Sequence, residues 1–138
     1  MTGIVVAQEC DYRVSRTGEL FVIGVRGFWD RGSVVEFQRR LQLLVELSGM
    51  THWGLVVDFR EWEGASEEAM SLLEALFEWM ADYGEIAAAF VVNSGVTSAA
   101  LQMVRTSQEA RVAFETFISL EIAIPWVAGT LRRGRGVE

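Results

Sequence analysis

The stretch Gly54-Leu55-Val56-Val57-Asp58-Phe59 decides how this chain folds. It is a nearly continuous apolar run with β-branched residues at its centre, without alternation of apolar and polar positions. A run of this kind is typical of a strand that is buried on both faces of a parallel sheet. Segments with helical periodicity lie on both sides of it, so the sequence predicts an α/β fold.

The composition predicts a single globular domain. The chain has 138 residues, of which 51% are hydrophobic, with five Trp and eight Phe. A chain of this size buries about 68% of the surface that its unfolded form exposes, so it can build a substantial core. We assign residues 1–131 to this domain. Residues 132–138, which hold three of the arginines, are expected to form a short, disordered basic tail.

The charged residues exclude several kinds of chemistry. The formal net charge is -7, and all 12 basic residues are arginines. Without lysine the chain cannot use a Schiff-base lysine, a lysine general base or the phosphate-binding lysine of a P-loop. The acidic balance also argues against non-specific binding of nucleic acid, which depends on neutralising phosphates.

The expected location follows from the cysteine count and the apolar runs. Cys10 is the single cysteine, so an intramolecular disulfide is excluded, as suits a reducing compartment. The N-terminus lacks the charged start and long apolar stretch of a signal peptide. No apolar run approaches the length that spans a bilayer. We therefore expect a cytoplasmic protein without stable membrane insertion.

The first third of the chain predicts a hairpin and a helix. Residues 4–15 and 20–25 are expected to be two antiparallel strands that a turn at Thr17-Gly18 connects. Asp30 or Ser33 is expected to cap the next helix, which ends at Ser48-Gly49. Its expected buried positions recur at helical spacing: Val34, Phe37, Leu41, Leu44 and Leu47.

After the central strand, residues 60–65 are expected to form a short charged loop. Ser66 is then expected to be the N-cap of a second helix, with Glu67 and Glu68 in the first turn. This helix is expected to run to about Tyr83, with Gly84 as its C-cap. The apolar residues of this helix form two adjacent stripes along it. One stripe is Met70, Leu73, Phe77 and Met80, and the other is Ala69, Leu72, Leu76 and Trp79.

The remainder predicts further alternation of strands and helices. A strand is expected at 86–92, a helix opening at Thr97 or Ser98, a short strand at 112–114, and a last helix from Ser119 or Leu120. Pro125 is expected to kink that helix or end it early, because proline lacks the amide hydrogen. The order predicts a mixed, mostly parallel sheet of about five strands with an N-terminal antiparallel hairpin, and about four helices.

The order of these elements resembles a known family. The stretches that carry the resemblance are Gly27-Phe28-Trp29-Asp30, Val56-Val57-Asp58-Phe59-Arg60-Glu61-Trp62, the helix over 70–80 and the ending over 114–126. Residues 20–127 resemble the SpoIIAA-like family, which is related to STAS domains. The resemblance implies a single-domain sandwich of helices against a mixed sheet and implies little about activity.

The resemblance also directs attention to Ser66. Classical anti-sigma-factor antagonists carry an Asp-Ser-Ser/Thr-Gly motif at the start of the helix after the third strand, where a partner kinase phosphorylates the serine. The corresponding stretch here is Glu63-Gly64-Ala65-Ser66-Glu67-Glu68, in which Glu67 replaces the glycine. Ser66 is therefore either a phosphorylation site or a plain N-cap.

No arrangement of residues predicts catalysis. His52 is the only histidine, and no nucleophile elbow accompanies it. Cys10 lies between two acidic residues, which disfavour a reactive thiolate. No loop has the regular acidic spacing of a calcium site. We expect a non-enzymatic protein without a metal or cofactor.

The carboxyl ends of the predicted parallel strands offer one candidate ligand site, because ligands of open α/β sheets bind there. Aromatic and polar residues gather at these ends: Trp29, Asp30, Asp58, Arg60, Trp62, Asn93 and Ser94. Aromatic walls with a few polar groups are typical of a pocket for a small molecule. In the alternative, the tryptophans only cover the end of the sheet.

The wide apolar face of the second helix offers a candidate interface. Phe77, Trp79 and Met80 either belong to a fully buried helix or contact a partner, as in a symmetric homodimer. The leading hypothesis is a non-enzymatic STAS-like interaction or regulatory domain that presents helix faces to a protein partner. The alternative is a binding module for a small apolar or acyl ligand, since the fold partly resembles the lipid-binding SEC14 class.

Overall fold

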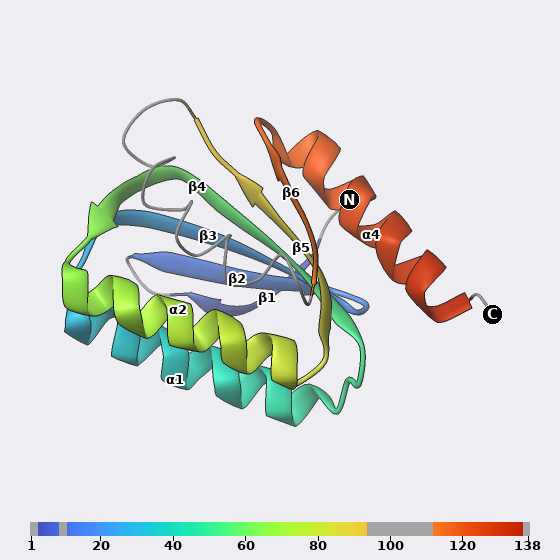
Figure 1. Ribbon diagram of the computed structural model, residues 1–138, viewed down its shortest axis with the longest axis horizontal. Coiled ribbons are helices and arrows are strands. Elements are labelled where there is room, and N and C mark those ends of the chain that lie inside the picture. Colours follow the sequence, from blue (N-terminus) through green and yellow to red (C-terminus); the bar gives the residue numbers. More distant parts are fainter. Residues whose placement is uncertain (1–2, 9–10, 94–111, 137–138) are drawn as a thin grey trace.

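The computed structural model describes residues 3–8, 11–93 and 112–136 and shows one mixed sheet with helices on both faces (Figure 1). The strands lie in sequence order, and β1 to β3 are antiparallel neighbours whereas β3 to β6 are parallel. The six strands are β1 (Ile4–Gln8), β2 (Tyr12–Thr17), β3 (Leu20–Trp29), β4 (Trp53–Ala65), β5 (Glu85–Val91) and β6 (Ala113–Phe117). The α/β sandwich is confirmed, and the described residues hold one strand more than expected.

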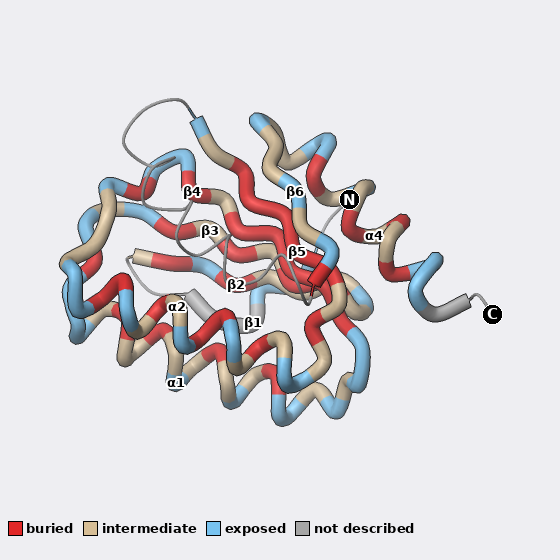
Figure 2. The backbone as a smooth tube through the Cα atoms, in the orientation of Figure 1, coloured by how far each residue is buried: buried red, intermediate tan, exposed pale blue. Residues whose placement is uncertain are grey.

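Two helices cover one face of the sheet and a third covers part of the other. Helices α1 (Arg31–Ser48) and α2 (Glu67–Asp82) lie side by side on the first face, and α4 (Leu120–Gly136) packs over β4, β5 and β6 on the second (Figure 1). The central strands are buried between these layers (Figure 2). Leu55 and Val57 face α1 and α2, whereas Val56 faces α4. The central stretch is thus buried on both faces, as its composition predicts.

The N-terminal segment contains two strands, whereas its sequence predicts one. Strands β1 and β2 pair antiparallel, so that Ile4 lies opposite Arg16. The polar stretch Glu9-Cys10-Asp11 between them is poor in strand-forming residues, which was a signal for a break. The turn at Thr17-Gly18 is confirmed, and Gly18 has a positive φ of 59°.

Strands β3 and β4 both run further than expected, which corrects the predicted loop over 60–65. β3 continues to Trp29, and β4 continues to Ala65. The two extensions pair with each other, up to Trp29 opposite Ala65. The charged end of β4 is stable as a strand here because its backbone hydrogen-bonds to the extended end of β3.

The predicted N-caps of α1 and α2 are confirmed. The carboxylate of Asp30 accepts from the amide of Ser33, and the hydroxyl of Ser66 accepts from the amide of Ala69. The burial of α1 differs in one respect: Val45 is buried, whereas Leu47 is 75% exposed. Val45 lies four residues after Leu41 and therefore on the same inner face of the helix. Leu47 lies six residues after Leu41, which places it on the outer side.

The ends of α2 and α4 also correct the expectations. α2 is capped by Tyr83 rather than by Gly84. α4 contains Pro125 and still runs to Gly136, so residues 132–136 are helical and not a disordered tail. Inward residues at intervals of four (Ala123, Val127 and Leu131) pack this helix on the sheet. The expected helix from Thr97 or Ser98 lies outside the described residues. None of the described helices is long and apolar enough to cross a membrane.

Candidate functional site

The structure brings together three of the seven residues predicted at the strand ends. The guanidinium of Arg60 binds the carboxylate of Asp58 through two contacts, Nε to Oδ1 at 2.9 Å and Nη2 to Oδ2 at 2.8 Å. The side-chain amide of Asn93 donates to the backbone carbonyl of Arg60 at 3.0 Å. This hydrogen bond therefore links strand β4 to the segment that follows β5. Ser94 lies outside the described residues.

This ion pair fixes the charge of the strand end. The hydrogen bond to Asp58 raises the pKa of the Arg60 guanidinium above its ordinary value, since it favours the charged form. The Asp58 carboxylate also accepts from the backbone amide of Arg60 at 3.0 Å. With both oxygens engaged, Asp58 presents little free negative charge to a ligand.

The two tryptophans do not join this polar group, because they lie on the other face of the sheet. Trp29 is 1% and Trp62 is 4% exposed, and both pack in the core under α1 and α2. The indole of Trp29 donates to the carbonyl of Arg26 at 2.8 Å. The cavity beside these rings has a volume of about 20 Å³, room for a single water molecule. The predicted aromatic pocket at the strand ends is therefore wrong.

A bulge in β4 explains why Trp62 faces the core. Gly24 pairs with Asp58, but Arg26, two residues later, pairs with Glu61, three residues later. The extra residue in β4 returns Trp62 to the face of Phe59, and their ring centroids lie 5.2 Å apart. Strict alternation would have placed the two rings on opposite faces.

Asp30, also predicted at this site, acts as the cap of α1. Its Oδ1 accepts from the amide and the hydroxyl of Ser33, each at 3.0 Å. These bonds lower the pKa of the Asp30 carboxyl below its ordinary value, because they stabilise the carboxylate. Asp30 is therefore committed to the helix end.

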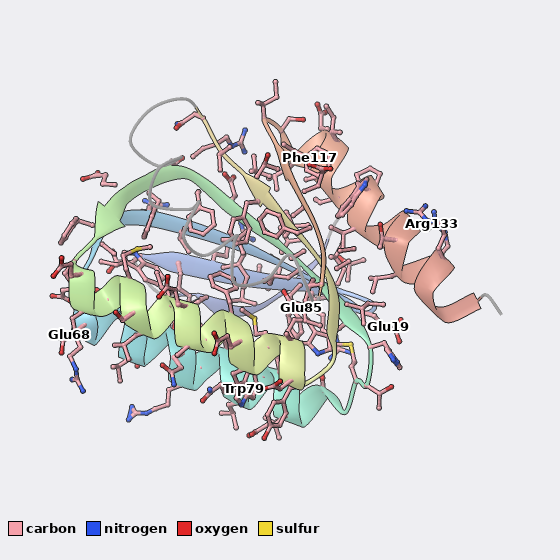
Figure 3. All side chains as sticks on the ribbon, viewed as in Figure 1. Glu19, Glu68, Trp79, Glu85, Phe117 and Arg133 are labelled. Atoms are coloured by element: carbon pink, nitrogen blue, oxygen red, sulfur yellow. The ribbon has the colours of Figure 1, made fainter. Side chains whose placement is uncertain are left out.

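The starts of α1 and α2 form a second polar surface at the same end of the sheet. Ser66 is half-buried, and its amide donates to the carbonyl of Trp29 at 3.0 Å, which ties the α2 cap to the end of β3. Nε of Arg31 lies 3.4 Å from Oε2 of Glu68 across the two helix starts. Figure 3 labels Glu68 at the start of α2. Phe28, which pairs with Gly64 near the end of β4, is 59% exposed. We call Phe28, Ala65, Ser66, Glu67 and Ser71 the α2 N-terminal surface.

The predicted interface on α2 is corrected for two of its three residues. Phe77 and Met80 are only 4% and 1% exposed, and they pack in the core of the protein itself. Trp79 is partly exposed and stacks on Tyr83, with ring centroids 4.4 Å apart. The wide apolar face of α2 is thus occupied by the sheet and α1.

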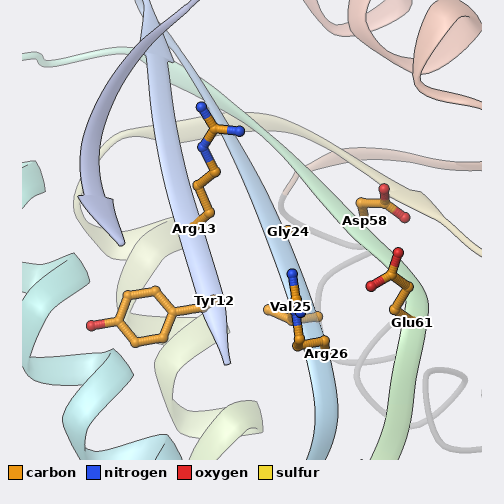
Figure 4. Close-up of a pocket in the computed structure, with 7 residues that line it drawn as sticks. All are labelled: Tyr12, Arg13, Gly24, Val25, Arg26, Asp58 and Glu61. Atoms are coloured by element: carbon orange, nitrogen blue, oxygen red, sulfur yellow. The ribbon is translucent and has the colours of Figure 1, made fainter. Parts of the chain in front are cut away.

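A charged hollow that was not predicted from the sequence lies on the sheet face that α1 and α2 do not cover (Figure 4). It has a volume of about 250 Å³. Its lining comes from β2, β3 and β4: Tyr12, Arg13, Gly24, Val25, Arg26, Asp58 and Glu61. The charged lining residues lie far apart in sequence, so only the strand pairing brings them together.

The part of the chain that the structure describes contains no group of three or more side chains that could hold a metal ion. His52 is exposed, and its Nδ1 lies 3.4 Å from the hydroxyl of Thr51.

Comparison with known proteins identifies the fold through structure rather than sequence. No protein-family model matches the chain, and no curated protein matches it. An uncharacterised DUF3478-family protein with a SpoIIAA-like fold from Shewanella loihica PV-4 superposes with a TM-score of 0.68 at 12% identity, covering 88% of this chain and 97% of that one.

Two regulators are similar to the chain in the same way. An anti-sigma factor antagonist from Mycobacterium paratuberculosis gives a TM-score of 0.61 at 16% identity, covering 83% of this chain and 91% of that one. The anti-sigma factor antagonist SpoIIAA in its unphosphorylated form gives 0.61 at 18% identity, covering 86% and 96%. The predicted SpoIIAA-like, STAS-related fold is therefore confirmed.

Proposed function

We propose that this protein is a non-enzymatic STAS-like regulatory domain that binds a protein partner through the α2 N-terminal surface. Structural neighbours that are anti-sigma factor antagonists support a role in regulation by protein contact. The observation that carries the proposal is Phe28, a large aromatic side chain that is 59% exposed and that pairs with Gly64, two residues before the α2 cap. Aromatic residues are enriched among those that dominate binding energy in protein interfaces.

The charges around the start of α2 indicate the chemistry of the partner. Glu63, Glu67 and Glu68 are exposed around the start of α2, and Arg31 offsets only part of their charge. A partner with an apolar pocket for Phe28 and a rim of basic side chains complements this surface, since opposite potentials favour encounter and register. Burial of the exposed 59% of Phe28 would contribute about 1–2 kcal/mol, roughly three-fifths of the value for a fully exposed side chain.

Ser66 is the candidate for regulation at the same surface. SpoIIAA is known in a phosphorylated as well as an unphosphorylated form. A phosphate on Ser66 would lie at the positive end of α2, where the helix dipole favours it, but beside Glu67, which repels it. The added charge would change the contact with a basic partner, and we propose this as the regulatory step.

The alternative, a binding module for a small apolar or acyl ligand, has less support. Such a ligand would need to displace the rings around the cavity of about 20 Å³ beside Trp29 and Trp62. Close packing makes that displacement costly, because the surrounding side chains would lose contacts.

Affinity capture with two matched variants tests the proposal. Phe28→Asp and Ile122→Asp each place a carboxylate at an exposed apolar position, and Ile122 is 55% exposed on α4, on the other layer of the fold. The proposal predicts that proteins captured from the producing cells are lost with Phe28→Asp and retained with Ile122→Asp. Loss with Ile122→Asp alone, or equal capture by both, would contradict it.

A further inference from the structure

We propose that the charged hollow over β2, β3 and β4 binds a small zwitterion, a molecule that carries a phosphate or carboxylate and an ammonium group. The hollow lies on the sheet face opposite α1 and α2 (Figure 4). None of its residues belongs to the α2 N-terminal surface, so this site and the proposed partner surface can fail independently.

Gly24 makes the floor of the hollow. In the row that crosses the sheet, Arg13 on β2 pairs with Gly24 on β3, and Gly24 pairs with Asp58 on β4. A Cβ atom placed on Gly24 would meet nothing within 4 Å. Neighbouring strands lie about 4.8 Å apart, so Arg13 and Asp58 stand on either side of a gap of roughly 10 Å.

Two arginines supply the positive side. Arg13 on β2 pairs with Gly24 on β3, so Arg26, two residues further along β3, is the diagonal neighbour of Arg13. The backbones of such diagonal neighbours lie about 7–8 Å apart. Neither guanidinium forms an ion pair within the described residues, and both side chains are exposed. Two adjacent cations repel each other, and an oxyanion between them removes the repulsion while accepting hydrogen bonds from both.

Glu61 supplies the negative side. It lies opposite Arg26 on β4 and lines the same hollow. The other carboxylate there, Asp58, is already held by Arg60 in a two-contact ion pair. Glu61 is therefore the group that meets the positive end of a ligand, and it disfavours a ligand that carries negative charge alone.

The volume sets the size of the ligand. The volume of about 250 Å³ is just below the roughly 300–1,000 Å³ of typical pockets for small molecules. This suits a small metabolite or a lipid headgroup and is too small for a peptide with several side chains. Phosphoethanolamine has the required phosphate and ammonium groups and serves as the probe.

Isothermal titration calorimetry of the full chain tests the site with three probes: phosphoethanolamine, inorganic phosphate and ethylamine. We expect phosphoethanolamine to bind most tightly, phosphate more weakly and ethylamine not measurably. Arg13→Gln and Arg26→Gln should each weaken phosphoethanolamine binding by at least about tenfold, the usual effect of losing a hydrogen bond to a charged group. Glu61→Gln should remove the preference for phosphoethanolamine over phosphate.

Two further variants control for shape and for charge. Gly24→Val fills the floor, leaves every charge in place and suits a strand, so it should abolish binding while the protein stays folded. Arg39→Gln removes an exposed arginine of α1, outside the hollow, and should leave binding unchanged.

Sedimentation with phosphatidylethanolamine vesicles distinguishes a lipid headgroup from a free molecule as the source of the ligand. Absence of phosphoethanolamine binding at millimolar concentration, or equal binding by wild type, Gly24→Val and Arg26→Gln, would overturn the proposal.

Discussion

Replacing Gly54 with alanine should force helix α4 away from the sheet. Gly54 lies in β4 on the face that α4 covers. A Cβ atom at this position would lie 2.5 Å from Cγ1 of Val127 and 3.1 Å from Cδ1 of Leu131. Since carbon atoms normally approach to about 3.5–4.0 Å, Val127 would need to retreat by about 1 Å or more. The glycine therefore permits the close contact of helix and strand.

The expected loss follows from two opposing effects. Overpacking of a core typically costs about 1–3 kcal/mol. Alanine also restricts the unfolded chain, which stabilises the protein by about 0.4–1 kcal/mol. The net result should be a free energy of unfolding lower by about 1–2 kcal/mol. Gly24→Ala is the matched control, because Gly24 lies on the same face of the adjacent strand with nothing within 4 Å of the added Cβ.

Urea unfolding followed by tryptophan fluorescence measures both variants. Gly54→Ala should lower the urea concentration at the unfolding midpoint. In a thermal melt, its melting temperature should fall by roughly 4 °C for each kcal/mol of stability lost. Gly24→Ala should be as stable as the wild type or slightly more so. Val127→Ala removes the clashing methyl group, so the double variant with Gly54→Ala should lose less stability than the sum of the single variants. Equal stability of the two alanine variants, or strict additivity with Val127→Ala, would refute the reasoning.

Two further predictions concern the helix caps. Ser66→Ala removes the acceptor for the amide of Ala69 and should lower the free energy of unfolding by about 0.5–2 kcal/mol, measured by urea unfolding; an unchanged midpoint would contradict the cap role. The folded-state pKa of Asp30 is lowered from 3.8, so its stabilising effect is complete well above that pH and is lost as pH falls through the folded-state pKa. The stability difference between wild type and Asp30→Ala should accordingly be constant from about pH 5 to 7 and shrink in more acidic solution; a difference that grows on acidification would show the opposite sign.

The central strands were predictable because burial on both faces leaves a direct signal in composition. The run Leu55-Val56-Val57 has no polar position, and the structure places alternate residues in two separate cores. The full length of β4 was not predictable in the same way, since residues 60–63 are mostly charged. Their strand conformation depends on pairing with the end of β3, a partner that lies far away in sequence.

The candidate sites depended still more on pairing and register. Helix caps are local, so Asp30 and Ser66 could be placed from sequence alone. Trp62 was expected to face a ligand, but the bulge in β4 turns it into the core. Arg13 and Glu61 carried no signal of proximity, because two successive strand pairings are needed to bring them to one hollow.

Hydrogen–deuterium exchange on the complex with the captured partner tests the proposed function most directly. The proposal predicts slower exchange at the end of β4 and in the first turns of α2, from about residue 64 to 71, with no change in α4. The Phe28→Asp variant should show no such slowing under the same conditions. Protection confined to α4, or a bound partner that leaves the start of α2 unprotected, would contradict the proposal.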